Sequence, residues 1–349
     1  MNSLRSTERS LTLLALKAKA NHGCKTQRYF HSKISGPYGC TKTLGKKLLF
    51  ENFGVKRSYS RALKIKIRDG VPPLRQISTS LNEIPLLNPN KPDPSRTKLA
   101  AIEPIRPITL PRFPTGSSNL PSVTKVLSAT MPAESAFILN KWKEAMIRKL
   151  GATGFAKYQQ DTFQRGHMLH SLLANYLLGE GEPKVGDGEL STDIICNLWK
   201  SIHNVVREKI SNVRLVEHIV THPSMNYRGI VDCVAFYENE LSVIDFKTAE
   251  KPKKSVGDLY DNPLQVSAYC GAINNDNNIP SHVIDRNISA AVVIVAYVDG
   301  SEASIYRLNR EQILDNYWKE WTRRLEQFSK LADFKTEPKK KFNQLKPTM

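Results

Sequence analysis

The spacing of hydrophobic residues predicts three helices in the middle of the chain. They cover residues 132–150, 155–178 and 192–209, where apolar side chains recur at helical intervals. Pro132 suits the first position of a helix, and Gly151 suits the position just after one. In the first of these helices, four apolar residues are expected to face the core: Phe137, Trp142, Met146 and Leu150.

Shorter runs rich in β-branched and aromatic residues predict the strands of a sheet. They cover residues 213–221, 229–237, 241–247, 289–298 and 301–307. The second and third runs flank a polar turn and predict a β-hairpin, and Asp299-Gly300 predicts another hairpin between the last two. With further helices over residues 263–273 and 310–331, this order predicts one α/β domain, in which helices flank a central mixed β-sheet.

Two acidic residues stand among the apolar residues of the second and third predicted strands. Asp232 and Asp245 each lie between two apolar neighbours, where a carboxylate is costly unless it is paired or holds a cation. Lys247 follows Asp245 by two positions, so both side chains lie on the same face of an extended strand. Two carboxylates and an ammonium group suit a hard divalent cation used in phosphate chemistry. The alternative is an ordinary salt bridge at a strand end.

The order of the motifs resembles the RecB-like branch of the PD-(D/E)XK nuclease superfamily. An aspartate follows a Gly-x-x step in one strand, the next strand ends in Asp-x-Lys-Thr, and a helix with Gln265 and Tyr269 comes after it. A Gly-x-x-x-His motif, Gly166 to His170, lies upstream on a predicted helix. The resemblance covers about residues 120–330 and implies a restriction-endonuclease-like core that hydrolyses phosphodiester bonds.

The resemblance also implies which residues form the catalytic metal site. His170, Asp232 and Asp245 would hold Mg²⁺ or Mn²⁺, with the backbone carbonyl of Phe246 as a further ligand. Lys247 would complete the catalytic set by positioning the attacking water, or helping to deprotonate it, and by stabilising the charge that develops.

Three more residues are expected to support this site. Gly166 lies one helical turn from His170 and would let a phosphate or another backbone approach closely. Glu217 shares a strand face with apolar residues and therefore needs a partner, although a place in water at a strand edge is the alternative. Thr248 ends the Asp-x-Lys-Thr motif.

The substrate that the resemblance implies is DNA, preferably a single strand with a free end. Gln265 and Tyr269 resemble the Gln-x-x-x-Tyr motif of the branch, which touches the DNA backbone. Basic side chains are further candidates for substrate binding, with solvated surface as the alternative: Lys251, Lys253 and Lys254, and also Lys141, Lys143, Arg148 and Lys149.

Charge is concentrated at the beginning of the chain. Residues 1–80 hold 17 Lys or Arg and only three acidic residues, so most of the net charge of +18 lies there. Residues 1–60 are basic, rich in serine and poor in acids, which predicts a mitochondrial presequence, with a basic disordered tail as the alternative. Residues 61–119 are proline-rich and are expected to be extended or disordered. The nuclease domain is expected to cover residues 120–334, and a basic tail is expected over residues 335–349.

The remaining features limit cofactors, partners and location. Five cysteines lack a pairing pattern, which fits a reducing compartment. Some of the RecB-like nucleases that the chain resembles hold an iron–sulfur cluster with four cysteines, three of them near the C-terminus; no cysteine follows Cys270 here, so no such cluster is expected. No apolar run reaches the roughly 18–20 residues of a membrane span. The resemblance and the presequence together predict a monomeric exonuclease of the mitochondrial matrix. It would trim single-stranded and flap DNA in mtDNA replication and maintenance, in contact with mitochondrial replication proteins. The alternatives are a non-catalytic mitochondrial nucleic-acid-binding factor on a nuclease fold, and a RecB-like endonuclease or RNase.

Overall fold

The computed structural model describes residues 80–94, 104–109, 119–183 and 192–336. The chain divides into two compact units, Met1–Ile65 and Lys66–Met349, and all described residues belong to the second unit. The predicted presequence lies outside the described residues, and so does most of the predicted basic tail. No helix among the described residues is long and apolar enough to cross a membrane.

A five-stranded mixed sheet forms the centre of the described domain. Its strands follow the order β1 (Ile210–His222), β2 (Tyr227–Tyr237), β3 (Glu240–Ala249), β4 (Ala291–Tyr297) and β5 (Ser304–Leu308). Only β3 and β4 pair in parallel; the other neighbours are antiparallel. Glu238 and Asn239 join β2 to β3 with positive φ angles, as a tight hairpin turn requires. The predicted mixed sheet and this hairpin are confirmed.

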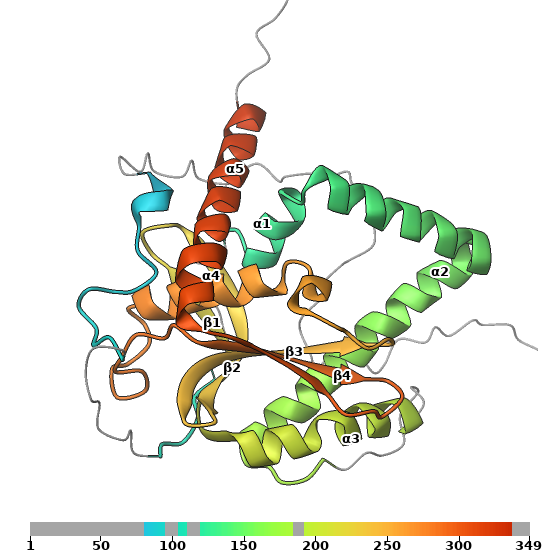
Figure 1. Cartoon of the computed structure of the whole chain (residues 1–349), viewed down its shortest axis with the longest axis horizontal. Helices are drawn as coiled ribbons and strands as arrows, with labels where there is room; N and C mark the ends of the chain where they lie inside the picture. Colours follow the sequence, from blue (N-terminus) through green and yellow to red (C-terminus); the bar gives the residue numbers. More distant parts are fainter. Residues whose placement is uncertain (1–79, 95–103, 110–118, 184–191, 337–349) are drawn as a thin grey trace, which may run out of the picture. The chain divides into compact units, whose positions relative to one another are not determined.

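Helices cover both faces of the sheet, as Figure 1 shows. On one face, α1 (Val123–Ala129), α4 (Asn262–Asn275) and α5 (Trp318–Thr336) contribute to one apolar core. On the other face, α3 (Thr192–Lys209) and the C-terminal half of α2 (Ala133–Leu177) contribute to a second core. Short helical segments complete the domain: η1 (Leu81–Glu83), η3 (Val256–Leu259) and η4 (Gln312–Tyr317). This is the α/β, restriction-endonuclease-like architecture that the sequence predicts.

Helix α2 replaces the first two predicted helices and bends sharply at Gly151 (Figure 1). Gly151 has φ 72° and ψ 165°, a backbone conformation that is essentially restricted to glycine. We call residues 133–150 the first arm and residues 152–177 the second arm. The buried residues of α2 all belong to the second arm: Phe155, Arg165, Leu169 and Leu173.

The expectation that the first arm faces the core is wrong. Phe137 is 59% exposed, Trp142 43% and Leu150 39%, while Met146 is half-buried. At about 100° per residue, Trp142, Met146 and Leu150 lie within about 80° of one another, whereas Phe137 lies on the opposite side of the helix. A shared stripe therefore does not by itself place a helix against the core. Trp142 instead packs across the bend, with its ring 5.9 Å from that of Phe155 in an edge-on arrangement.

Part of the proline-rich segment packs against the domain. Leu81 and Leu86 are buried in the same core as α4 and α5. The indole Nε1 of Trp318 donates to the carbonyl oxygen of Ile84 at 3.0 Å, and Ile108 forms a parallel bridge with Leu215 of β1. The core thus includes side chains that precede residue 120.

Candidate functional site

The two aspartates of the predicted site lie where β2 and β3 separate. The ladder between these strands ends at the pair Cys233 and Ile244, and Asp232 and Asp245 come next on each strand. Beyond this point β2 continues beside β1, and β3 continues beside β4. The amide of Phe246 donates to Asp232 Oδ2 at 2.8 Å in place of a ladder partner. The sheet therefore places both carboxylates in a fork between two strands.

Glu217 reaches the same place from β1. Its neighbours Val216 and His218 pair with Cys233 and Val231, so Glu217 lies opposite Asp232 in the register. Glu217 has φ 45°, which is strained for a residue with a side chain and costs about 1–3 kcal/mol. Strain of this kind is typical of functional sites.

His170 comes from the second arm of α2 and lies against these two acids. Its Nδ1 is 3.2 Å from Glu217 Oε1 and 3.6 Å from Asp232 Oδ2. One ligand atom from each of the three residues lies within 4.8 Å of the other two, an arrangement that could hold a metal ion. Burial lowers the pKa of His170, but Asp232 and Glu217 outweigh it and raise this pKa to about 9. Without a cation, the imidazole is therefore protonated at neutral pH and offsets the carboxylates.

Asp245 and Lys247 form an ion pair beside this cluster. Lys247 Nζ is 2.6 Å from Asp245 Oδ2, and the Asp245 side chain is only 1% exposed. Apart from this ion pair, neither Asp245 oxygen has a hydrogen-bond partner among the described residues. Burial raises the pKa of Asp245; Lys247 opposes the rise and Asp232 adds to it. Burial lowers the pKa of Lys247, but Asp245 and Asp232 outweigh it and raise this pKa, so the amine is an ammonium at neutral pH.

These groups fit a hard divalent cation. The carboxylates of Glu217 and Asp232 meet the imidazole of His170, and the buried carboxylate of the adjacent Asp245 has Lys247 as its ion-pair partner but no hydrogen-bond partner among the described residues. A cation would satisfy these buried oxygens. Carboxylate oxygens are the ligands that Mg²⁺ prefers, and Mn²⁺ also accepts them together with an imidazole. The structure thus brings together His170, Glu217 and Asp232, with Asp245 and Lys247 adjacent. The role of the Phe246 carbonyl stays a prediction.

The predicted Gln-x-x-x-Tyr motif is built into α4. Tyr269 is 3% exposed, and its hydroxyl accepts a hydrogen bond from Gln265 Nε2 at 2.8 Å. A Cβ at Gly229 would come within 2.3 Å of the Tyr269 ring, so glycine is needed there for β2 and α4 to pack. Tyr269 therefore holds the amide of Gln265, which is half-buried.

The other predicted residues differ in their surroundings. A Cβ at Gly166 would meet no atom within 4 Å, so no protein backbone approaches it and the space beside it is open. Thr248 is half-buried and pairs with Ala296 in the ladder between β3 and β4. The predicted basic residues are exposed, or half-buried in the case of Lys143 and Lys253.

One polar cluster near the site was not predicted. Arg165 Nη2 donates to Glu250 Oε1 at 2.9 Å, and the Tyr158 hydroxyl donates to Glu250 Oε2 at 3.2 Å. These bonds connect the second arm, which carries His170, to the residue that follows β3. An arginine on a helix and a glutamate after a strand have no spacing signal that would connect them, so the sequence alone does not reveal this cluster.

Comparison with known proteins agrees with this geometry. A family model described as the PD-(D/E)XK nuclease superfamily matches residues 141–341. The chain is similar to proteins named "Mitochondrial genome maintenance exonuclease 1". It is 40% identical to that of Xenopus tropicalis over 255 residues, which are 73% of this chain and 70% of the relative. It is 36% identical to that of Homo sapiens over 266 residues, covering 76% and 70% of the two chains, respectively.

Proposed function

Since the chain belongs to the PD-(D/E)XK nuclease superfamily and is a nuclease, we propose that it hydrolyses single-stranded DNA from a free end. One observation carries the catalytic part of the proposal: His170, Glu217 and Asp232 meet beside the Asp245–Lys247 ion pair. Nucleases of this superfamily use divalent metal ions, and the donor groups at this site suit Mg²⁺ or Mn²⁺.

Each residue of the site has a role in the proposed reaction. Asp232, Asp245 and His170 would hold the cation, together with the carbonyl of Phe246, and Glu217 lies in the same group of possible ligands. When bound, the cation makes water more acidic and offsets negative charge at the phosphate. The Lys247 ammonium donates hydrogen bonds to the phosphate oxygens and to the attacking water, and so stabilises the charge that develops on the phosphate.

Three further residues support the ligands and the substrate. Glu217 accepts a hydrogen bond from the imidazole of His170 and so fixes the orientation of the ring. Gly166 leaves open space beside this histidine for a phosphate, and Thr248 continues the strand that carries Lys247. Gln265 donates one N–H of its side-chain amide to Tyr269 and the other to a phosphate oxygen of the DNA backbone.

The surface of α2 supports a single-stranded substrate. The first arm exposes Phe137 and Trp142, and Lys141 Nζ lies 4.6 Å from the centre of the Phe137 ring. Exposed aromatic rings beside basic side chains are typical of proteins that stack unpaired bases and track the phosphate backbone. The basic residues of the first arm and of the loop after β3 would contact the phosphates: Lys141, Lys143, Arg148, Lys149, Lys251, Lys253 and Lys254.

The location and the biological role follow from the first 60 residues and from the names of the relatives. A presequence over residues 1–60 would direct the nuclease domain, proposed over residues 120–334, to the mitochondrial matrix. There the enzyme would act as a monomer on flaps and free ends of mtDNA during replication and maintenance, in contact with replication proteins.

A cleavage assay tests the proposed function. The protein is incubated with Mg²⁺ and labelled linear single-stranded DNA, circular single-stranded DNA, a blunt hairpin duplex or RNA. We expect cleavage of the linear single strand alone, and no cleavage in EDTA or with Asp245→Asn, which keeps the shape of the side chain but removes its charge. Cleavage of the circle would indicate an endonuclease, and preferred cleavage of RNA an RNase. Binding without cleavage by the unmodified protein would indicate a non-catalytic factor.

A further inference from the structure

Tyr260 exposes an aromatic ring on the loop between the catalytic strand and α4. This loop begins after β3, which carries Lys247, and ends at the helix that carries Gln265. Tyr260 is 78% exposed, the highest value among the large hydrophobic side chains of the described residues. An aromatic side chain in water contributes nothing to the core, and its ring can stack with a ligand.

The backbone at Tyr260 is strained as well as exposed. Its φ of 53° and ψ of −123° belong to a region that glycine and asparagine tolerate far better than tyrosine. Such a conformation costs about 1–3 kcal/mol and persists only where the surrounding structure imposes it. The fold thus holds this residue in a costly conformation without burying its ring.

Hydrogen bonds fix the loop before Tyr260. The hydroxyl of Tyr297 accepts from the Lys253 amide at 2.9 Å, and the hydroxyl of Tyr306 donates to the Lys253 carbonyl at 2.8 Å. Ser255 and Asp258 form a capping box over η3. Lys253 Nζ lies 5.2 Å from the centre of the Tyr260 ring, so a positive charge covers one face of this ring.

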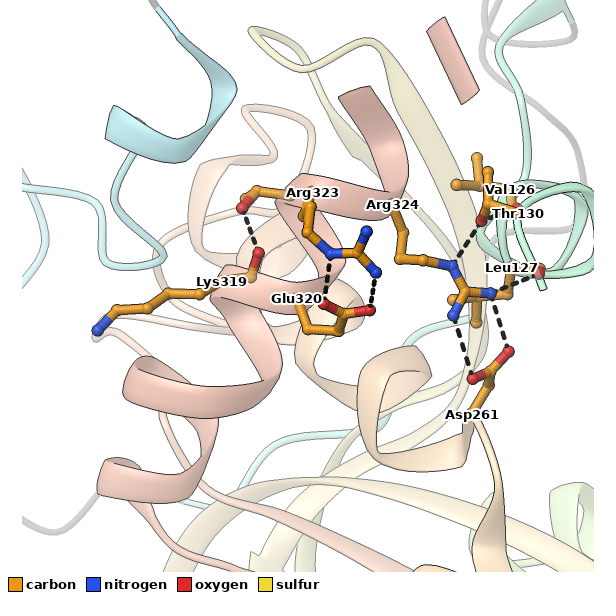
Figure 2. A network of polar contacts seen from close by, with 9 residues as sticks. Val126, Leu127, Thr130, Asp261, Lys319, Glu320, Arg323 and Arg324 are labelled. Atoms are coloured by element: carbon orange, nitrogen blue, oxygen red, sulfur yellow. Dashed lines mark hydrogen bonds and ion pairs between the residues drawn. The ribbon is translucent and has the colours of Figure 1, made fainter. Parts of the chain in front are cut away.

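The residue after Tyr260 is fixed by a buried arginine. Figure 2 shows Arg324 of α5 reaching toward Asp261, while the neighbouring Arg323 points away to Glu320. Arg324 is 1% exposed, and its Nη2 lies 3.1 Å from Asp261 Oδ2. It also donates to Thr130 Oγ1 and to the Leu127 carbonyl, both at 2.7 Å (Figure 2). The loop therefore presents the ring from a rigid support.

We propose that Tyr260 is a stacking site for a base of the single-stranded substrate. The base lies on the face of the ring opposite Lys253, and the Lys253 ammonium pairs with a phosphate of the same strand. An aromatic ring accepts any base in this way, so the contact holds the strand on the loop that follows the catalytic strand without reading its sequence. This inference rests on the proposed function, because it requires a single-stranded nucleic acid.

The test compares two substitutions of Tyr260 in the full chain. Tyr260→Phe keeps the ring, whereas Tyr260→Asn removes the ring but suits the same backbone conformation. Binding is measured in EDTA, where cleavage is not expected, with single-stranded DNA carrying the fluorescent base 2-aminopurine at successive positions. Thermal unfolding verifies that each variant is folded, and we expect Tyr260→Asn to be at least as stable as the unmodified protein.

We expect the unmodified protein and Tyr260→Phe to quench one 2-aminopurine position, because stacking quenches its fluorescence. Tyr260→Asn should lose this quenching and bind DNA about tenfold more weakly, the effect of losing one stacked base. Equal affinity and equal quenching in Tyr260→Asn would overturn the stacking site while the unmodified protein still binds and cleaves the strand. Failure of the unmodified protein to bind or cleave single-stranded DNA would overturn the proposed function itself.

Discussion

At the scale of single residues, substitution of Lys247, the partner of Asp245 in an ion pair, should affect cleavage much more than DNA binding. Lys247 touches the metal site through one buried carboxylate, whereas the proposed DNA contacts are spread over α2 and the loop after β3. Lys247→Ala should therefore lower the cleavage rate by about 10²–10³-fold, because a charged donor to the phosphate is lost. Affinity for single-stranded DNA should change less than about threefold. Single-turnover cleavage and fluorescence anisotropy measure the two quantities.

A control for this substitution is Lys330→Ala. Lys330 lies on α5 and pairs with Glu326 at the surface, where an ion pair contributes little. It should change neither cleavage nor binding. If Lys247→Ala cleaved normally at saturating enzyme but bound DNA poorly, the lysine would be a binding residue and its assigned role would be wrong.

His222 gives a pH dependence that is independent of the metal site. Its ring is 1% exposed and lies near Tyr227 and Trp318, and Nδ1 accepts from the Met225 amide. Burial lowers the pKa of His222 to about 4, below the value near 6.5 of an unfolded chain. The unfolded state therefore binds a proton first as the pH falls, so this stabilisation is complete above pH 6.5 and is lost progressively toward pH 4.

The expected size of this effect can be measured with a matched variant. Between pH 7 and pH 5, His222 should lower the free energy of unfolding by about 2 kcal/mol. His222→Asn keeps an acceptor for the Met225 amide but has no titrating ring, so the unfolding free energy of this variant should decrease less over the same range. Urea unfolding at several pH values tests this, with the exposed His282→Asn as control. Equal pH dependence in His222→Asn and the unmodified protein would show that His222 does not contribute to the pH dependence of the unfolding free energy.

At the scale of elements, the strands could be predicted better than the course of α2. The β2–β3 hairpin follows from local residues: two apolar runs, a polar turn, and acids at positions where the ladder ends. The bend at Gly151 and the exposure of the first arm do not follow from local residues, because the spacing of apolar residues does not indicate where a helix lies relative to the sheet. Helix α1 was missed although Ser122 accepts a hydrogen bond from the Lys125 amide as its cap, because the segment is only seven residues long.

Alanine substitutions at two glycines of α2 should have opposite effects on the stability of the protein. Gly151 needs a conformation that alanine avoids, so Gly151→Ala should destabilise the bend by about 1–3 kcal/mol. Gly166 has helical geometry and open space at its Cβ, so Gly166→Ala should stabilise the helix by about 1 kcal/mol. If the DNA backbone uses this space, Gly166→Ala should nevertheless raise KM several-fold. Thermal unfolding and steady-state cleavage measure both effects; unchanged kinetics in a stabilised Gly166→Ala would remove its role in substrate binding.

At the scale of the whole molecule, the site could be predicted in part because its central residues belong to short motifs. Asp232, Asp245 and Lys247 lie on one hairpin, so their convergence follows from strand geometry alone. The contacts that fix the surrounding elements join positions far apart in the chain: Arg165 to Glu250, and Arg324 to Asp261. No local pattern encodes such pairs, because each partner is an ordinary helical or loop residue until the fold brings the two together.

Other long-range contacts, made by residues 80–94, lead to a prediction about where the folded domain begins. A chain that starts at residue 120 loses Leu81 and Leu86 from the core, and each buried leucine contributes about 1.5–3 kcal/mol. Two polar side chains also lose one partner each. Asn274 loses the Leu86 carbonyl but keeps its bond to the Ile288 carbonyl, and Arg310 loses its ion pair with Asp93 at 2.8 Å but keeps Ser289. Each hydrogen bond lost in this way costs about a further 0.5–1.5 kcal/mol.

A chain that starts at residue 80 keeps all these contacts and serves as the reference. Relative to it, the chain from residue 120 should melt roughly 10–20 °C lower, because each kcal/mol shifts Tm by about 2–4 °C in a domain of this size. Leu86→Ala in the longer chain should reproduce about 2–5 kcal/mol of the loss and remains measurable if the shorter chain aggregates. Equal melting temperatures of both chains, and of Leu86→Ala, would mean that the domain folds from residue 120 onward and that the preceding segment only lies against its surface.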